Sequence, residues 1–371
     1  MNDKDIAARR RKANPFTARL AWQSVAVPVL AAALVWLVFR FLRDVAAAFP
    51  PLVQAVAAVV AGIGGIAAAY LAVHWLVDRY PDWAKEKIQP YVFIGPAVAL
   101  LAWMLFIPTL RTLYLSFLDA RATDFVGLAN YAAVFTERTL LFALRNNVYW
   151  VVLGTFACVA LGLLIAILAD RSRFETLAKS AIFMPMAISS VAAGVIWRFI
   201  YYYTPGDERQ IGLLNAIVRL FGGEPQAWTS LVQPGNNFLL IVIMVWTQTG
   251  FAMVLFSAAI KGVPEDLLEA ARMDGASEVR IFFNIIVPYI QKTIVAVTTT
   301  IIVFSLKIFD IVMVMTGGQY GTEVIATQFY KQLFTYNNSG VGSTIAIVLL
   351  IIVVPVIVYN LRTFQQEGGF R

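Results

Sequence analysis

The feature that most constrains this chain is a series of long apolar runs separated by short polar segments. A membrane-spanning helix needs about 20 mostly apolar residues. Eight runs meet that length, at residues 22–42, 52–77, 91–118, 147–169, 180–203, 238–260, 292–316 and 341–361. Because lipid offers backbone groups no hydrogen-bond partners, we expect each run to be a helix. The sequence therefore predicts an all-α polytopic membrane protein with about eight transmembrane helices.

The overall composition excludes a soluble protein with one apolar core. Hydrophobic residues make up 60% of the 371 positions and charged residues 14%, against roughly 45–50% and 25% in soluble domains. Cys158 is the only cysteine and His74 the only histidine, which excludes an intrachain disulfide and a cysteine metal site. We expect no metal, no cofactor and no catalytic residue.

The net charge of +7 is explained better by membrane orientation than by nucleic-acid binding. With the N-terminus in the cytoplasm, the inside segments carry 17 of the Lys and Arg residues and the outside segments carry 7. This excess predicts that both termini are cytoplasmic. Tyr201–Tyr203 lie near the end of a span, where aromatic rings commonly settle at the membrane interface.

One connection between spans has the pattern of a folded element. Residues 263–288 read VPEDLLEAARMDGASEVRIFFNIIVP. Pro264 suits the first position of a helix, and Asp274-Gly275 signals a turn. Ser277 is a suitable N-cap for a second helix over 278–286. We predict two short helices on the cytoplasmic side, with small residues that let another protein approach closely.

The spacing in this segment resembles the EAA loop of permease subunits in binding-protein-dependent ABC importers. The matching residues are Glu269, Ala270, Ala271, Gly275, Ile285, Val287 and Pro288, with Val287 in place of the usual leucine. In that family the loop forms the coupling helix, which docks in a groove of the ATPase subunit. For the loop at 264–288, the resemblance implies that contact with an ATPase involves Glu269, Ala270, Ala271, Asp274, Gly275 and Pro288.

Further motifs resemble the first permease of carbohydrate importers, the maltose and alpha-glucoside group. In chain order they are Phe125-Val126-Gly127-Leu128, Asn130-Tyr131, Phe135, Asn146-Asn147, Met184-Pro185, Phe309-Asp310 and Met315-Thr316-Gly317-Gly318. The resemblance implies a six-helix type I importer core over 91–371. A cytoplasmic N-terminus and two extra transmembrane helices would precede it over 1–90.

The same family implies the partners and the location. These are a second permease subunit in a heterodimer, two copies of an ATP-binding subunit, an extracytoplasmic sugar-binding protein and the lipid bilayer of a bacterial inner membrane. No GxxxxGK[ST] phosphate loop occurs in the sequence, so ATP must be hydrolysed by a partner and the chain is not itself an enzyme. The expected function is import of an alpha-glucoside, a maltose- or trehalose-like oligosaccharide or a related solute by alternating access.

Polar residues within the spans are candidates for the substrate path, because they are costly in lipid. Lys307 and Asp310 are three positions apart on one predicted helix and able to pair across a turn. A path lining and a pair that only fixes helix packing both stay open. By resemblance, substrate faces Met186, Ser190, Met244, Thr247, Gln248, Phe251 and Ser305. Packing between helices is the alternative for each, and Gln248 is the strongest candidate.

Two other classes of function compete with the importer. An ion-coupled secondary carrier would use Lys307 and Asp310 as its coupling pair, but it would leave the folded segment at 264–288 unexplained. Carriers also often show internal repeats, and no repeat is evident. An intramembrane enzyme would need a catalytic group, and the spans hold no cluster of acids. The identity of the sugar stays open.

Overall fold

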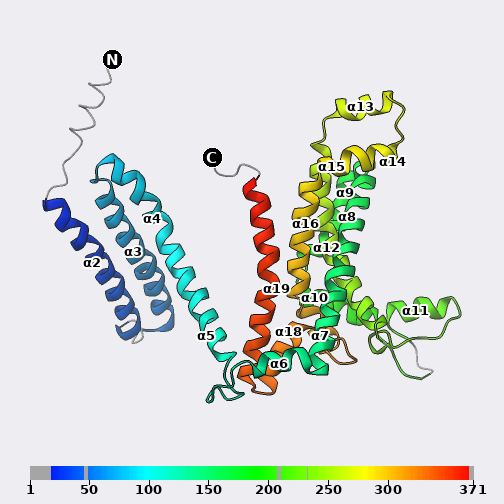
Figure 1. Ribbon diagram of the computed structural model, residues 1–371, viewed down its shortest axis with the longest axis horizontal. Helices are drawn as coiled ribbons and strands as arrows, with labels where there is room; N and C mark the ends of the chain where they lie inside the picture. The colour runs from blue at the N-terminus through cyan, green and yellow to red at the C-terminus, as the bar shows by residue number, and fades with distance from the viewer. Residues whose placement is uncertain (1–17, 46–48, 207–209, 232, 367–371) are drawn as a thin grey trace. The chain divides into compact units, whose positions relative to one another are not determined.

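The computed structural model describes residues 18–45, 49–206, 210–231 and 233–366, which form helices joined by turns (Figure 1). Six of the described helices are long and apolar enough to cross a membrane. Two further helix pairs pass the same test together but bend by 103° and 71°. The predicted all-α fold is confirmed, with six to eight candidate spans.

Internal contacts divide the chain into two compact units, Met1–Thr109 and Leu110–Arg371. The predicted division after residue 90 falls inside helix α4 (Asp82–Leu101). The extent of the importer core stays a prediction.

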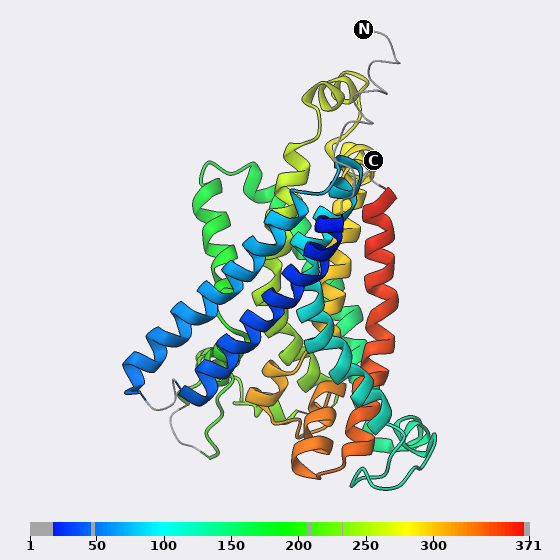
Figure 2. The same cartoon turned by 90° about the vertical axis from the view of Figure 1, so that its left-hand side faces the viewer.

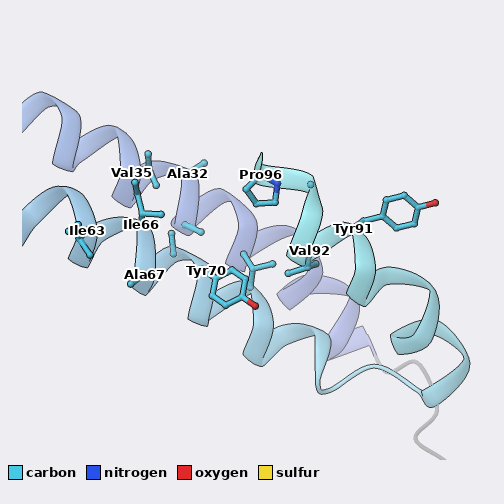
Figure 3. Close-up of a pocket in the computed structure, with 13 residues that line it drawn as sticks. Ala32, Val35, Ile63, Ile66, Ala67, Tyr70, Tyr91, Val92 and Pro96 are labelled. Carbon is cyan, nitrogen blue, oxygen red and sulfur yellow. The ribbon is translucent and has the colours of Figure 1, made fainter. Parts of the chain in front are cut away.

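The first unit is built from α2 (Ala18–Arg40), α3 (Pro51–Val77) and α4. Helices α2 and α3 approach closely at Gly65, where a Cβ would lie 2.6 Å from Cγ2 of Val38. An apolar groove of about 740 Å³ lies among the three helices, and Figure 3 shows Val35, Ile66 and Pro96 in its lining. In a bilayer such a lining matches acyl chains as well as it matches apolar side chains.

The third predicted span is one long helical stretch, Asp82–Leu115, with a change of winding inside it. A π-helical turn at Ala102–Phe106 joins α4 to α5 (Ile107–Leu115). Pro108 stands two positions after the end of this turn, and prolines and π turns are the usual causes of helix kinks.

The second unit contains the remaining helices and several π or 3₁₀ turns between them (Figures 1 and 2). The helices are α6 (Ala129–Thr136), α7 (Arg138–Tyr149), α8 (Thr155–Asp170), α9 (Glu175–Phe183), α10 (Ser190–Ile200), α11 (Leu213–Leu220), α12 (Gly235–Lys261), α13 (Glu265–Met273), α14 (Glu278–Ile281), α15 (Val287–Tyr289), α16 (Gln291–Leu306), α17 (Asp310–Met315), α18 (Ile325–Tyr330) and α19 (Ser339–Gln366). The end of this unit that includes α13 is called the α13 end. The end that includes α18 is called the α18 end.

Helix α12 lies at the centre of the core of this unit. Leu240, Ile243 and Met253 on it are completely buried. Small residues bring its neighbours close: a Cβ on Gly162 of α8 would lie 2.5 Å from Cβ of Ala252. Such close approach is how helices pack where lipid removes the hydrophobic driving force between them.

Two predicted spans are not continuous helices. The run 180–203 divides into α9 and α10, which meet at 103° across a 3₁₀ turn at Met184–Ala187 that contains Pro185. The run 292–316 ends early, because α16 stops at Leu306 and a separate helix, α17, begins at Asp310. The prediction of one helix through 316 is therefore wrong. An acidic residue in a first helical turn is favourable, so Asp310 suits a new helix start.

Candidate functional site

The segment 264–288 forms two helical stretches joined by a tight turn, and Figure 1 shows its helix α13 projecting from one end of the unit. Glu265 and Asp266 stand in the first turn of α13, where carboxylates favour the helix dipole. Pro264 stands at the N-cap with an extended ψ of 129°, one position before its predicted place. The helix therefore begins with the residue after the proline.

The turn after α13 depends on glycine for its backbone shape. Gly275 has a φ of +78°, a left-handed conformation that side chains disfavour. The N–H of Gly275 donates to the carbonyl of Arg272, and the N–H of Ala276 donates to that of Ala271, each at 3.0 Å. A Cβ at Gly275 would meet no atom within 4 Å, so the requirement is conformational and not one of space. The predicted Asp274-Gly275 turn is present.

The second helical stretch is longer than predicted. The Oγ of Ser277 accepts a hydrogen bond from the N–H of Arg280 at 3.4 Å, as its predicted N-cap role requires. Helix α14 then continues through a π turn at Phe282–Ile286 into α15, which ends at Tyr289 instead of 286. Beyond Ile290 the chain bends by 71° into α16.

A carboxylate joins three elements at this end. An oxygen of Glu278 lies 2.9 Å from Nε of Arg272 on α13, and the other lies 2.7 Å from Nη2 of Arg171 after α8. The hydrogen bond that Arg272 donates to Glu278 raises the pKa of Arg272 above its ordinary value. All three side chains are exposed, so the pairs orient α13 more than they stabilise the fold. Sequence spacing alone does not reveal the Arg171 contact, because it joins residues 107 positions apart.

Most of the surface of α13 is left uncovered by the described part of the chain. None of its residues is buried, and Leu267 and Met273 are 48% and 88% exposed. Glu269 and Ala270 are also exposed, while Ala271 is half-buried. Asp274, Gly275 and Pro288 are exposed as well. A helix with exposed apolar residues beside alanines offers a face that suits a partner protein.

Three candidate path residues are buried inside this chain. Met244 is completely buried, and its Cε would lie 2.3 Å from a Cβ on Gly154, so it fills space left by that glycine. The hydroxyl of Ser305 donates to the carbonyl of Ile301 at 2.9 Å and lies 3.4 Å from Sδ of Met244. The hydroxyl of Thr247 donates to the carbonyl of Met244 at 3.0 Å. In this structure Met244 and Ser305 meet between α12 and α16, and Thr247 is bonded within its own helix.

The other candidates, on α12, at the start of α10 and in the 3₁₀ turn before it, retain access to solvent or lipid. Gln248, Phe251 and Ser190 are half-buried, and Met186 is 40% exposed. No residue in the described ranges forms a hydrogen bond with the side-chain amide of Gln248. An amide with free donors and acceptor is suited to hydroxyl groups.

Lys307 and Asp310 do not lie on one helix. Lys307 caps the end of α16, Asp310 opens α17, and both are exposed. Within the described residues no ion pair joins them. The prediction of a pair across one helical turn is wrong, because it assumes helical spacing where the helix has ended.

Two neighbouring asparagines fix a loop at the α18 end. The amide nitrogen of Asn146 donates to the carbonyls of Gly321 and Glu323, each at 2.7 Å. The amide oxygen of Asn147 accepts from the N–H of Ile325 at 2.7 Å. Sequence motifs flagged this asparagine pair, but they did not indicate which loop it holds.

The motif at 125–135 is likewise built into a packed corner. The amide of Asn130 donates to the carbonyls of Ser116 and Leu118 at 2.9 and 2.7 Å. The hydroxyls of Tyr131 and Ser116 lie 2.8 Å apart. Gly340, at the start of α19, leaves no room for a Cβ, which would lie 2.2 Å from the carbonyl of Leu118. These bonds attach the turn after α5 to α6, and the close approach at Gly340 packs α19 against the same turn.

This chain is similar in sequence to several known proteins. Residues 158–366 match the family described as the binding-protein-dependent transport system inner membrane component. The osmoprotective compounds uptake permease protein of Synechocystis sp. is 52% identical over 281 residues, which are 76% of this chain and 100% of that relative. The alpha-glucoside transport system permease protein of Rhizobium meliloti is 41% identical over 336 residues, 85% of this chain and 99% of the relative.

A solved structure has the same fold at low sequence identity. A chain of a bacterial ABC transporter involved in the import of the acidic polysaccharide alginate superposes with a TM-score of 0.64 and 18% identity. The match covers 75% of the present chain and 96% of that one. A second structure of the alginate transporter, in complex with an alginate pentasaccharide-bound periplasmic protein, gives a TM-score of 0.65 and 16% identity.

Proposed function

The chain belongs to the binding-protein-dependent ABC transporter inner membrane permeases, and we propose that it carries an alpha-glucoside or a related glycoside into the cytoplasm. It is a permease subunit of an ABC importer and not the ATPase of that importer. This membership replaces the alternative of an ion-coupled secondary carrier. The observation that carries the substrate class is the 41% identity to an alpha-glucoside permease across 99% of that relative.

The substrate proposal includes small osmoprotective glycosides. The relative at 52% identity is named for the uptake of osmoprotective compounds. A glycoside of glucose with a polyol and an alpha-linked disaccharide share a hexose ring with hydroxyl groups, so one path can admit both. Gln248, Phe251, Ser190 and Met186 are the proposed contacts, because these side chains are not fully buried within the chain.

The proposed mechanism is alternating access driven by partner subunits. A second permease completes the path, and two ATP-binding subunits close and open on the cytoplasmic side. In this proposal α13 docks on an ATP-binding subunit through Glu269, Ala270, Ala271, Asp274 and Gly275, and Pro288 lies in the second helical stretch of the loop. The exposure of α13 supports this role, and the excess of Lys and Arg on the predicted inside segments supports cytoplasmic termini. A loaded binding protein would deliver the glycoside at the opposite end.

The test is uptake by the purified importer in proteoliposomes. Labelled maltose, trehalose and glucosylglycerol are offered with the binding protein, with ATP inside the vesicles. We expect ATP-dependent accumulation of at least one glycoside and no effect of a protonophore. Accumulation driven by an ion gradient without ATP, or uptake of none of these compounds by an assembled complex, would contradict the proposal.

A pull-down from mild detergent tests the coupling surface separately. The wild-type chain should retain an ATPase and a second permease. A Glu269→Lys, Gly275→Pro variant should keep the second permease and lose the ATPase, because only α13 and its turn are changed. Retention of the ATPase by that variant would place the contact elsewhere.

A further inference from the structure

A cavity at the α18 end of the second unit combines aromatic rings with hydrogen-bonding groups. Its volume is about 470 Å³, within the range of roughly 300–1,000 Å³ typical of small-molecule sites. Its lining comes from the end of α10, the segment 227–230, helix α17 and the following loop. The side chains that matter for recognition are Arg198, Tyr202, Tyr203, Thr229, Gln319 and Tyr320.

The loop that forms one wall is held by side chains from distant helices. Asn236, at the start of α12, donates to the carbonyl of Tyr320 at 2.8 Å. Asn146 and Gln233 both donate to the carbonyl of Gly321. Tyr320 itself has a φ of +55°, a conformation that a tyrosine rarely adopts. A residue held in such a conformation by its surroundings is a reason to look for a function.

The chemistry of the lining suits a polyhydroxylated ring. The side chains of Tyr202, Tyr203 and Tyr320 are 43%, 36% and 56% exposed, so their rings and hydroxyls are accessible. The side chains of Arg198 and Gln319 form no hydrogen bond or ion pair with any residue in the described ranges. Among the residues that the structure describes, none in the lining carries a carboxylate. Tyrosine rings stack on the apolar faces of a sugar ring, and guanidinium and amide groups bond to its hydroxyls.

We propose that this tyrosine cavity is a glycoside-binding site where the sugar is held before it enters the membrane, and that it is separate from the proposed path contacts Gln248, Phe251, Ser190 and Met186, none of which lines it. The inference deepens the proposed function and rests on its substrate class and on the topology that places the α18 end outside. It differs from a docking surface for the binding protein, which would not need a cavity lined by hydrogen-bonding groups that have no partner among the described residues.

The direct test is ligand-observed saturation-transfer NMR on the assembled importer in nanodiscs, with maltose, trehalose and glucosylglycerol as probes. Tyr320→Gly removes the ring while keeping the positive φ, because glycine adopts that conformation freely. Arg198→Gln is the second variant. Tyr336→Ala is the matched control, since Tyr336 is 61% exposed but does not line the cavity.

We expect saturation transfer to at least one glycoside in the wild type and the control, and about a tenfold weaker affinity in both cavity variants. Uptake at low sugar concentration should fall by a similar factor, while capture of the binding protein stays unchanged. Equal saturation transfer in wild type and both variants overturns the site. So does a loss of uptake that follows a loss of binding-protein capture, which would make the cavity a protein-docking surface. Failure of the proposed function has a different signature, because the wild-type complex would then transport no glycoside.

Discussion

The two ends of the second unit carry loops that are held in opposite ways. At the α13 end, the turn at Gly275 is closed by backbone bonds between residues at most five positions apart. At the α18 end, the loop 316–324 is held by Asn236 and Asn146, which are 84 and 175 positions from the carbonyls they bind. The first loop is a local motif with an exposed surface, and the second is fixed by the packed core.

This difference matches what each end would do in a transporter. A coupling segment must move with a partner, so few buried contacts are an advantage there. A wall of a binding site must keep its shape, and amide side chains that satisfy buried carbonyls provide that rigidity. Substitutions at the α18 end should therefore affect stability, and those at the α13 end should affect coupling.

The largest expected effect on stability is that of Asn146→Ala. Asn146 is completely buried and donates to two carbonyls, which the substitution leaves without their partner. A loss of about 2–3 kcal/mol is expected, because unsatisfied buried polar groups are costly. Thermal unfolding in detergent should show a midpoint lower by several degrees.

The control for that measurement lies at the other end. Asn284 is exposed in the π turn after α14, and no described residue bonds its side chain. Asn284→Ala should leave the unfolding midpoint within about 1 °C of wild type, since exposed substitutions have small effects. Equal destabilisation by the two alanines would remove the contrast between the ends.

Gly275→Val should separate coupling from folding. A β-branched residue in the left-handed conformation costs roughly 1–2 kcal/mol, and the strain is confined to an exposed turn. We expect transport to fall more than tenfold while the protein remains in the membrane with a nearly unchanged unfolding midpoint. Gly275→Asn is the matched variant, because asparagine tolerates this conformation, and it should retain most transport. Equal loss of transport in both variants would indicate that any side chain at position 275 blocks coupling, and that the backbone conformation is not the cause.

Glu278→Gln should have a smaller effect that depends on salt. The carboxylate pairs with Arg272 and Arg171 on the surface, and salt screens exposed pairs. Hydrogen exchange of α13 at low ionic strength should be faster in the variant than in wild type. The difference should disappear at about 1 M salt, where the Debye length is near 3 Å. A difference that persists at high salt would show that the pairs are not its cause.

The contrast between a loop held by neighbouring residues and a loop held by distant residues also explains which features the sequence predicts. Six of the eight predicted spans and the Gly275 turn depend on local composition and neighbouring residues, and the sequence predicts them, with Pro264 misplaced by one position. Lys307 and Asp310 were placed on one helix, because a hydropathy pattern does not show that α16 ends at Leu306.

The sequence alone does not show which residues of different helices contact one another. Helix α12 is apolar on most of its surface, so its pattern does not reveal that Met244 and Thr247 face the interior of the chain. Tyr202 and Tyr203 were interpreted as interfacial aromatic residues, which their position near a span end justifies. Only the packing of α10 against α17 brings them beside Tyr320.

A pH dependence at the α18 end is the smallest expected effect. The carboxylate of Asp119 accepts hydrogen bonds from the N–H groups of Thr123 and Asp124 at 2.7 and 3.1 Å, which lowers its pKa. Because the folded-state pKa is the lower one, this stabilisation is complete above the ordinary value of about 3.9 and is lost as the pH falls through the folded-state pKa. Hydrogen exchange of the turn at 119–125, followed from about pH 5 to about pH 2, should therefore show acid-induced loosening beyond the intrinsic change in exchange rate.

Asp119→Asn should remove this acid response, whereas Asp124→Asn should keep it, since only a long contact of 3.4 Å from Thr123 reaches that carboxylate. An acid response unchanged in Asp119→Asn would assign it to another carboxylate at this end, and the turn would then be held by its backbone and by Asn130 alone.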